Sequence, residues 1–136
     1  MTRLALAAFA AGLLFSTGAM AATETFHATM TGAQQVPPVT TSAHGTATVT
    51  IDTATGKATW TVTYTGPEPF AAHIHGPAPA GKNAGVLVPM KVGPSPFTGS
   101  ATLTPKVIKI IEEGDAYVNL HTTAHKAGEM RGQLTK

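Results

Sequence analysis

Three histidines have the spacing of a metal site. His73 and His75 are separated by one residue, and His121 lies in a second alternating run further along the chain. Because alternate side chains of a strand point to the same face, His73 and His75 should lie roughly 6.5–7 Å apart along the backbone. An adjacent strand, about 4.8 Å away, can bring His121 beside them. Three imidazoles bind transition metals and leave a position open, so we predict one metal ion bound by this trio.

Copper is the predicted ion. The chain has no cysteine, and a neutral, nitrogen-rich site without thiolates follows the affinity order in which Cu²⁺ exceeds Zn²⁺. A fourth ligand would be water or one of three side chains, His27, His125 and Met90. His27 ranks first because it lies on a polar strand face, and for each candidate plain solvent exposure is the alternative. His44 lies outside the pattern and is interpreted as a surface residue.

Three further polar residues are candidates for supporting the site. Asn119 precedes His121 by two residues on the same face, where its side chain could hydrogen-bond to an imidazole and fix it. Glu129 and Arg131 also share a face. Two interpretations of this pair stay open: a structural link between strands, or an arginine that presents its planar fork to an anion near the metal.

Alternating apolar and polar residues run through most of the chain in short segments, separated by turns rich in Gly, Pro and Thr. This pattern predicts an all-β protein, a Greek-key-like antiparallel β-sandwich or barrel. One short helix is expected to begin at Thr104-Pro105 and to end at Gly114. The expected strands are 25–30, 46–51, 57–64, 70–75, 86–90, 97–103, 116–121 and 130–134.

The alternation also assigns side chains to the two faces of the sheet. The residues predicted to point into the core include Trp60, Val62, Phe70, Ile74, Val118 and Leu120. All three histidines fall on the polar faces, as do Tyr117, Asn119 and Arg131. We therefore expect the site on the outer surface of the sheet rather than inside the core.

The N-terminal residues have the pattern of a secretory signal peptide. Arg3 precedes an apolar stretch over 4–15, and Ala19-Met20-Ala21 fits a cleavage site, so residues 1–21 are predicted to be the signal and 22–136 the domain. The apolar stretch is shorter than the ~20 residues of a membrane span. We expect a periplasmic or secreted protein without a membrane span. Beyond Arg3, eight Lys and Arg balance seven Asp and Glu, which gives no argument for nucleic acid.

Four stretches resemble the CHRD domain, the module named from chordin and also found in many bacterial exported proteins. They occur in the order of that family and extend over nearly all of the predicted domain. The four stretches are GAQQVPP at 32–38, AHIHGP at 72–77, YVNLHT at 117–122 and GEMRGQL at 128–134. The occurrence of the family in chordin suggests a module that binds another protein or a matrix component.

A weaker resemblance is to copper/zinc superoxide dismutase, also a Greek-key β-sandwich with an H-x-H strand. It would place copper on His73, His75 and His121, and it would make Arg131 the counterpart of the arginine that guides the anion. The chain departs from that enzyme in residues 76–85, which contain neither His nor Asp for a zinc site, and in lacking cysteines for the disulfide.

Three functions follow as hypotheses. The first is an exported copper-binding protein for metal handling, and the second is an interaction module for a protein or matrix partner without metal. The third is a copper-only redox enzyme similar to superoxide dismutase. Metal content separates the second from the other two, and superoxide turnover separates the first from the third.

Overall fold

The computed structural model describes residues 11–14 and 22–136. Apart from 11–14, the predicted signal peptide lies outside the described residues. No helix in the described part is long and apolar enough to cross a membrane. The elements are β1 (Thr23–Thr31), a 3₁₀ turn η1 (Gly32–Gln34), β2 (His44–Asp52), β3 (Lys57–Thr65), β4 (Ala71–His75), β5 (Val86–Met90), β6 (Phe97–Thr102), α1 (Pro105–Glu112), β7 (Tyr117–His121) and β8 (Met130–Gln133).

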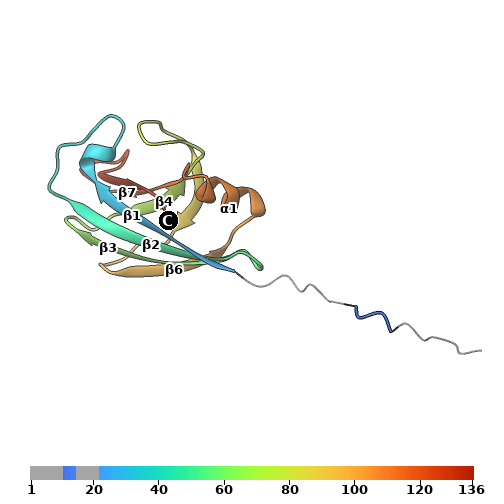
Figure 1. Ribbon diagram of the computed structural model, residues 1–136. Coiled ribbons are helices and arrows are strands. Elements are labelled where there is room, and N and C mark those ends of the chain that lie inside the picture. Colours follow the sequence, from blue (N-terminus) through green and yellow to red (C-terminus); the bar gives the residue numbers. More distant parts are fainter. Residues whose placement is uncertain (1–10, 15–21) are drawn as a thin grey trace, which may run out of the picture.

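The eight strands form one antiparallel sheet that curls into a nearly closed barrel (Figure 1). Their order is β5-β4-β7-β8-β1-β2-β3-β6, and the two edge strands, β5 and β6, approach each other. The chain forms the β1–β2–β3 meander, crosses to β4 and β5, returns to β6 beside β3, and crosses again to β7 and β8. These crossings confirm the predicted all-β, Greek-key-like class, and α1 is the one α-helix among the described residues.

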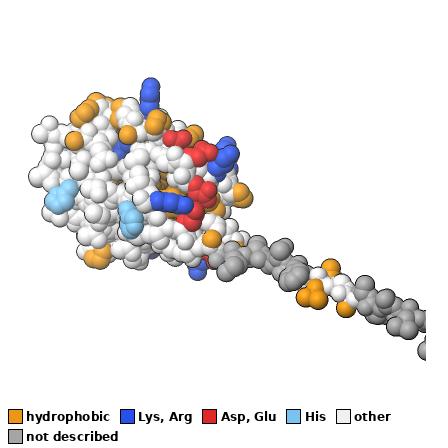
Figure 2. Space-filling model, viewed as in Figure 1, with side chains coloured by type: hydrophobic (Ala, Val, Ile, Leu, Met, Phe, Trp, Pro, Cys, Tyr) orange, Lys and Arg blue, Asp and Glu red, His pale blue; other side chains and the backbone are white. Residues whose placement is uncertain are grey.

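The meander follows the alternation in the sequence closely. Val49 of β2 pairs with Trp60 of β3, and both side chains are buried. The next pair along these strands, Thr48 and Thr61, points outward, and most other outward positions of the meander are also threonines. Much of the face visible in Figure 2 is accordingly uncharged, and the charged side chains gather toward the end where β1 begins.

Helix α1 begins and ends as predicted. The Thr104 hydroxyl accepts a hydrogen bond from the Val107 amide, at 3.3 Å, and Pro105 occupies the first helical position, where no amide donor is needed. Gly114 follows with a φ of +79°, a conformation that glycine adopts without strain. The helix buries Ile108 and Ile111 in the core.

The outer face of the sheet is covered around β7, contrary to the sequence-based expectation. Tyr117, Asn119 and Arg131 are 2%, 5% and 1% exposed. Segments 32–38 and 76–85 fold over this face and hydrogen-bond to the side chains on it. The predicted open outer surface is therefore wrong here, because alternation gives the side of a sheet and not what lies above it.

The Phe70 side chain also differs from its predicted position. The alternation predicts an inward side chain, yet Phe70 is 53% exposed. Strand β4 begins one residue later, at Ala71. The alternation of the strand therefore does not determine which way the Phe70 side chain points. Its backbone amide still donates to the His121 carbonyl, at 2.9 Å, and its ring lies 6.4 Å from the imidazole of His121.

Replacing Trp60 by alanine is expected to lower the free energy of unfolding by about 3–5 kcal/mol, as for other large-to-small core substitutions. The indole is 4% exposed and packs over Gly99, where an added Cβ would lie 2.6 Å from its Nε1 atom. Urea unfolding followed by circular dichroism measures the change. Thr61→Ala, at an exposed neighbouring position, should stay within about 0.5 kcal/mol of the parent protein. Native fluorescence typical of a fully exposed indole would contradict the assignment.

Candidate metal centre

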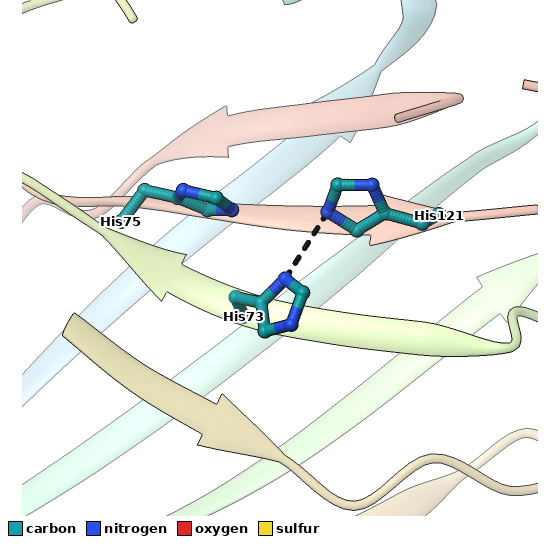
Figure 3. Close-up of side chains that lie close together, drawn as sticks. All are labelled: His73, His75 and His121. Atoms are coloured by element: carbon teal, nitrogen blue, oxygen red, sulfur yellow. Dashed lines mark hydrogen bonds between the residues drawn. The ribbon is translucent and has the colours of Figure 1, made fainter. Parts of the chain in front are cut away.

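The pairing of β4 with β7 brings the three histidines to one face. Ala71 pairs with His121, and His75 pairs with Tyr117, so His73 lies diagonally opposite His121. Since His73 and His75 are two residues apart in β4, both share the face of His121, on the side opposite the core. Figure 3 shows the three side chains turning toward one another from these two strands.

The three rings are close enough to share one ligand. Each ring offers a nitrogen, and these atoms lie within 4.8 Å of one another. The shortest contact joins Nδ1 of His73 to Nε2 of His121, at 3.2 Å (Figure 3). Ring centroids are 5.3 Å apart for His73 and His75, and 5.9 Å for His75 and His121. This trio is the cluster that the sequence predicts.

Backbone carbonyls fix the orientation of two rings. Nδ1 of His75 donates to the carbonyl of Ala84, at 3.0 Å, and Nδ1 of His121 donates to the carbonyl of Lys126, at 2.9 Å. A carbonyl only accepts, so each Nδ1 carries the proton and each Nε2 keeps its lone pair. Nε2 of His75 is buried and has no hydrogen-bond partner. Metal-binding histidines typically have this arrangement, in which the second nitrogen donates to a carbonyl.

A stack of planar groups supports the His75 ring from behind. The Tyr117 ring lies parallel to it, with a 4° interplanar angle and a 5.0 Å centroid separation. The Arg131 guanidinium lies 3.5 Å from the Tyr117 ring centroid. Because β4 and β8 flank β7, His75 and Arg131 approach Tyr117 from opposite sides. The Tyr117 hydroxyl also donates to the Ala84 carbonyl, at 3.1 Å, and so holds the residue that orients His75.

The electrostatics of the cluster favour neutral rings. Burial lowers the pKa of His73, and the adjacent His121 and His75 lower it further, because a second positive charge nearby is unfavourable. Burial also lowers the pKa of His75, against the smaller raising effect of its hydrogen bond to Ala84. Only the neutral imidazole offers a lone pair to a metal, so both shifts favour metal binding.

The supporting residues predicted from the sequence have other partners. Asn119 accepts a hydrogen bond from the Gln35 side chain, at 2.6 Å, and no hydrogen bond joins it to the three imidazoles. Glu129 accepts from the hydroxyls of Thr41 and Thr122, at 2.8 and 2.6 Å. Glu129 therefore ties the 32–43 region to the turn after β7.

The candidates for a fourth ligand are not brought to the cluster. Met90 pairs with Ala72 and is buried in the core, on the face opposite His73. His27 is exposed on β1, with its Nδ1 3.4 Å from the Thr48 hydroxyl. His125 is half-buried in the turn after β7. Among the described residues, the ligand group contains the three histidines without these side chains, which leaves the remaining position to water or an external ligand.

Sequence reasoning missed the residues that hold the cluster in place. Tyr117 was assigned only to a polar face, and its stacking depends on the distance between strands. Ala84 and Lys126 act through backbone carbonyls, so their side chains give no signal. Gln35 lies in the GAQQVPP stretch, but its partner Asn119 is 84 residues away. These contacts become visible only in the way the segments outside the strands fold over the sheet.

The fold and the site define a small all-β protein with three histidines on a covered sheet face. The family model of the CHRD domain matches residues 26–134, and the chain therefore belongs to the CHRD domain family. Neither the curated proteins nor the solved structures compared with this chain gave a match.

The metal-free protein is expected to lose stability as the pH falls below about 6.5. In the unfolded chain, His73 and His75 protonate near that value, whereas in the folded protein their pKa values are lower. Between the two values the unfolded state binds more protons, so acid favours unfolding. Urea midpoints measured in a chelator between pH 7.5 and 5.5 give the dependence.

A variant control isolates the contribution of the cluster. The double variant His73→Gln, His75→Gln should show a weaker pH dependence than the parent protein over this range. His44→Gln, at an exposed position outside the cluster, should retain the parental dependence. The same dependence in the double variant and the parent would contradict the assignment of the effect to these two rings.

Proposed function

We propose that this CHRD domain protein binds one copper ion through His73, His75 and His121 and handles the metal outside the cytoplasm. The observation that supports this most directly is the buried Nε2 of His75, which has no hydrogen-bond partner. A buried polar atom without a partner destabilises the fold, and a metal ion would satisfy this lone pair.

The donor set fits a transition-metal ion. Metal–nitrogen bonds of about 2.0 Å place two ligand atoms of one ion roughly 3.3–3.5 Å apart. Nδ1 of His73 and Nε2 of His121 are 3.2 Å apart, and the ligand atoms of all three rings lie within 4.8 Å of one another. Three neutral nitrogens without thiolate favour Cu²⁺ over Zn²⁺ by the usual affinity order.

Binding requires one rearrangement of protons. His121 carries its proton on Nδ1, so its Nε2 accepts the hydrogen bond from Nδ1–H of His73. To use Nδ1 as a ligand atom, His73 must adopt the other neutral tautomer, with its proton on Nε2. Nδ1 of His73 and Nε2 of His121 would then both offer a lone pair to the metal ion, and the hydrogen bond between these two atoms would be lost.

A role in metal handling is supported over dismutation by the segment that covers the site. Residues 76–85 contain neither His nor Asp, so they offer no zinc site beside the copper site. Signal-like residues at the N-terminus support export. Superoxide turnover near the diffusion limit by the copper-loaded protein would instead assign the redox role.

Removing ligands is expected to weaken copper binding by roughly 100-fold or more, because ligands contribute more than their supporting residues. The test is calorimetric titration of untagged protein with Cu²⁺ in the presence of a competing chelator. The variants are His73→Ala and His121→Ala, separately and together. His44→Ala is the matched control and should bind copper as the parent protein does.

The opposite result would change the proposed function. If the His73→Ala, His121→Ala double variant bound copper with the affinity of the parent protein, the cluster would not be the site. The remaining function would then be the interaction module without metal that the family's occurrence in chordin suggests.

Tyr117 should affect copper binding without touching the ion. Tyr117→Leu removes both the stack on His75 and the hydroxyl contact with Ala84, and we expect about 10–100-fold weaker binding, as for other residues that orient ligands. Tyr117→Phe keeps the ring and loses only the hydroxyl, so its copper affinity should lie between those of the parent protein and Tyr117→Leu. The copper d–d absorption should also change in Tyr117→Leu, because the angle of the His75 ring is released. Parental affinity and spectrum in a folded Tyr117→Leu protein would show that the stack does not position His75.

A further inference from the structure

Arg131 is a buried cation surrounded by neutral groups. Its side chain is 1% exposed. Nη1 donates to Oδ1 of Asn83, at 3.2 Å, and Nη2 donates to the Pro79 carbonyl and to Oε1 of Gln133, at 3.3 and 3.4 Å. One face of the guanidinium lies on the ring of Tyr117. A buried charge is costly unless a counter-charge accompanies it, and none of these partners is charged.

No carboxylate of the described residues supplies the missing counter-charge. Glu129, two residues away, accepts hydrogen bonds from the hydroxyls of Thr41 and Thr122 and forms no salt bridge with Arg131. The salt bridges of the described residues join other groups, Lys109 to Glu113 and Lys136 to Glu24. Burial lowers the pKa of Arg131 from its usual value, as expected for a cation without an anion beside it.

A pocket of about 420 Å³ borders this guanidinium. Arg131 and Gln133 form part of its wall, and the opposite walls come from residues 33–38 and 80–81. Those walls are mainly apolar, with the side chains of Ala33, Val36, Pro38 and Ala80. A volume of this size, apolar walls and a few convergent polar groups are typical of sites for small molecules.

We propose that this pocket binds a small organic carboxylate with an apolar body, whose carboxylate group pairs with Arg131. The guanidinium has five N–H donors. One on Nη1 and both on Nη2 are used within the protein, which leaves Nε–H and the second Nη1–H for a ligand. A carboxylate accepts a charge-assisted hydrogen bond from one of these donors and supplies the missing negative charge. One cation against apolar walls fits a singly charged group better than a phosphate, which needs more donors. The site is separate from the copper site and does not depend on the metal.

The test is a titration of the metal-free protein with phenylacetate, followed by ¹H–¹⁵N NMR spectra that include the Arg131 Nε–H signal. Saturable shifts are expected at this signal and at the backbone amides of 33–36 and 80–81. Phenylacetamide has the same shape without the charge, and it should bind at least tenfold more weakly. Phenethylamine, with the opposite charge, should not bind.

Two variants separate the pocket from the charge. Ala33→Trp fills the pocket from an exposed position and should abolish the phenylacetate shifts, whereas Ala54→Trp, in the exposed β2–β3 turn, should retain them. Arg131→Lys keeps the charge but loses the planar guanidinium with its free Nε–H and its hydrogen bonds to residues 79 and 83, and it should bind at least tenfold more weakly. Should Arg131→Lys fail to fold, the Ala33→Trp result decides.

Two results would overturn the proposal. The first is the absence of saturable shifts with phenylacetate at millimolar concentrations in the parent protein. The second is equal affinity for phenylacetate and phenylacetamide, which would show that the buried charge does not select the ligand. In either case Arg131 would serve only to fasten segment 76–85 to the sheet.

Discussion

Strand β7 is buried on both of its faces. On the face away from the core, this burial encloses a layer of polar side chains, which we call the polar layer. Val118 and Leu120 point into the core, which an antiparallel sheet requires of one face. Tyr117 and Asn119 point the other way and are also buried, beneath segments 32–38 and 76–85. Each polar atom on the covered face must therefore find a partner in those segments or in a neighbouring strand.

Most of these polar atoms are satisfied by fixed contacts. The side-chain amides of Gln35 and Asn119 bond to each other, and Gly128 makes room for the pair because an added Cβ would lie 2.4 Å from Oδ1 of Asn119. Two groups remain incompletely satisfied, Nε2 of His75 and the guanidinium of Arg131. One is a lone pair without a cation and the other is a cation without an anion. Tyr117 lies between them and contacts both.

The fold was readable from the sequence because most strands have one apolar and one polar face. The alternation located each strand to within a few residues, and it correctly put Trp60, Ile74 and Val118 in the core. The capping Thr104 and the terminal Gly114 located the helix by chemistry that is local in sequence. Phe70 was assigned wrongly because the pattern does not show where a strand stops.

The candidate site was readable only in part. Alternation predicts that His73, His75 and His121 share a face, and the pairing of β4 with β7 brings them together. The contacts that orient the rings come from the backbone of Ala84 and Lys126, which no side-chain pattern marks. The burial of Asn119 and Arg131 depends on segments 32–38 and 76–85, which lie outside the strands. The alternation therefore predicted the side of the sheet for these two residues but not their burial.

The four stretches that carry the family resemblance also supply core residues, but their polar side chains meet in this polar layer. GAQQVPP supplies Gln35, and AHIHGP supplies two of the histidines. YVNLHT supplies the third histidine with Tyr117 and Asn119, while GEMRGQL supplies Glu129 and Arg131. Apolar residues of a core can be exchanged for others of similar volume, whereas hydrogen-bonded partners must match in donor and acceptor. The polar residues of these stretches are therefore best understood as the parts of one covered polar layer, with the histidine cluster at one end of it and the Arg131 pocket at the other.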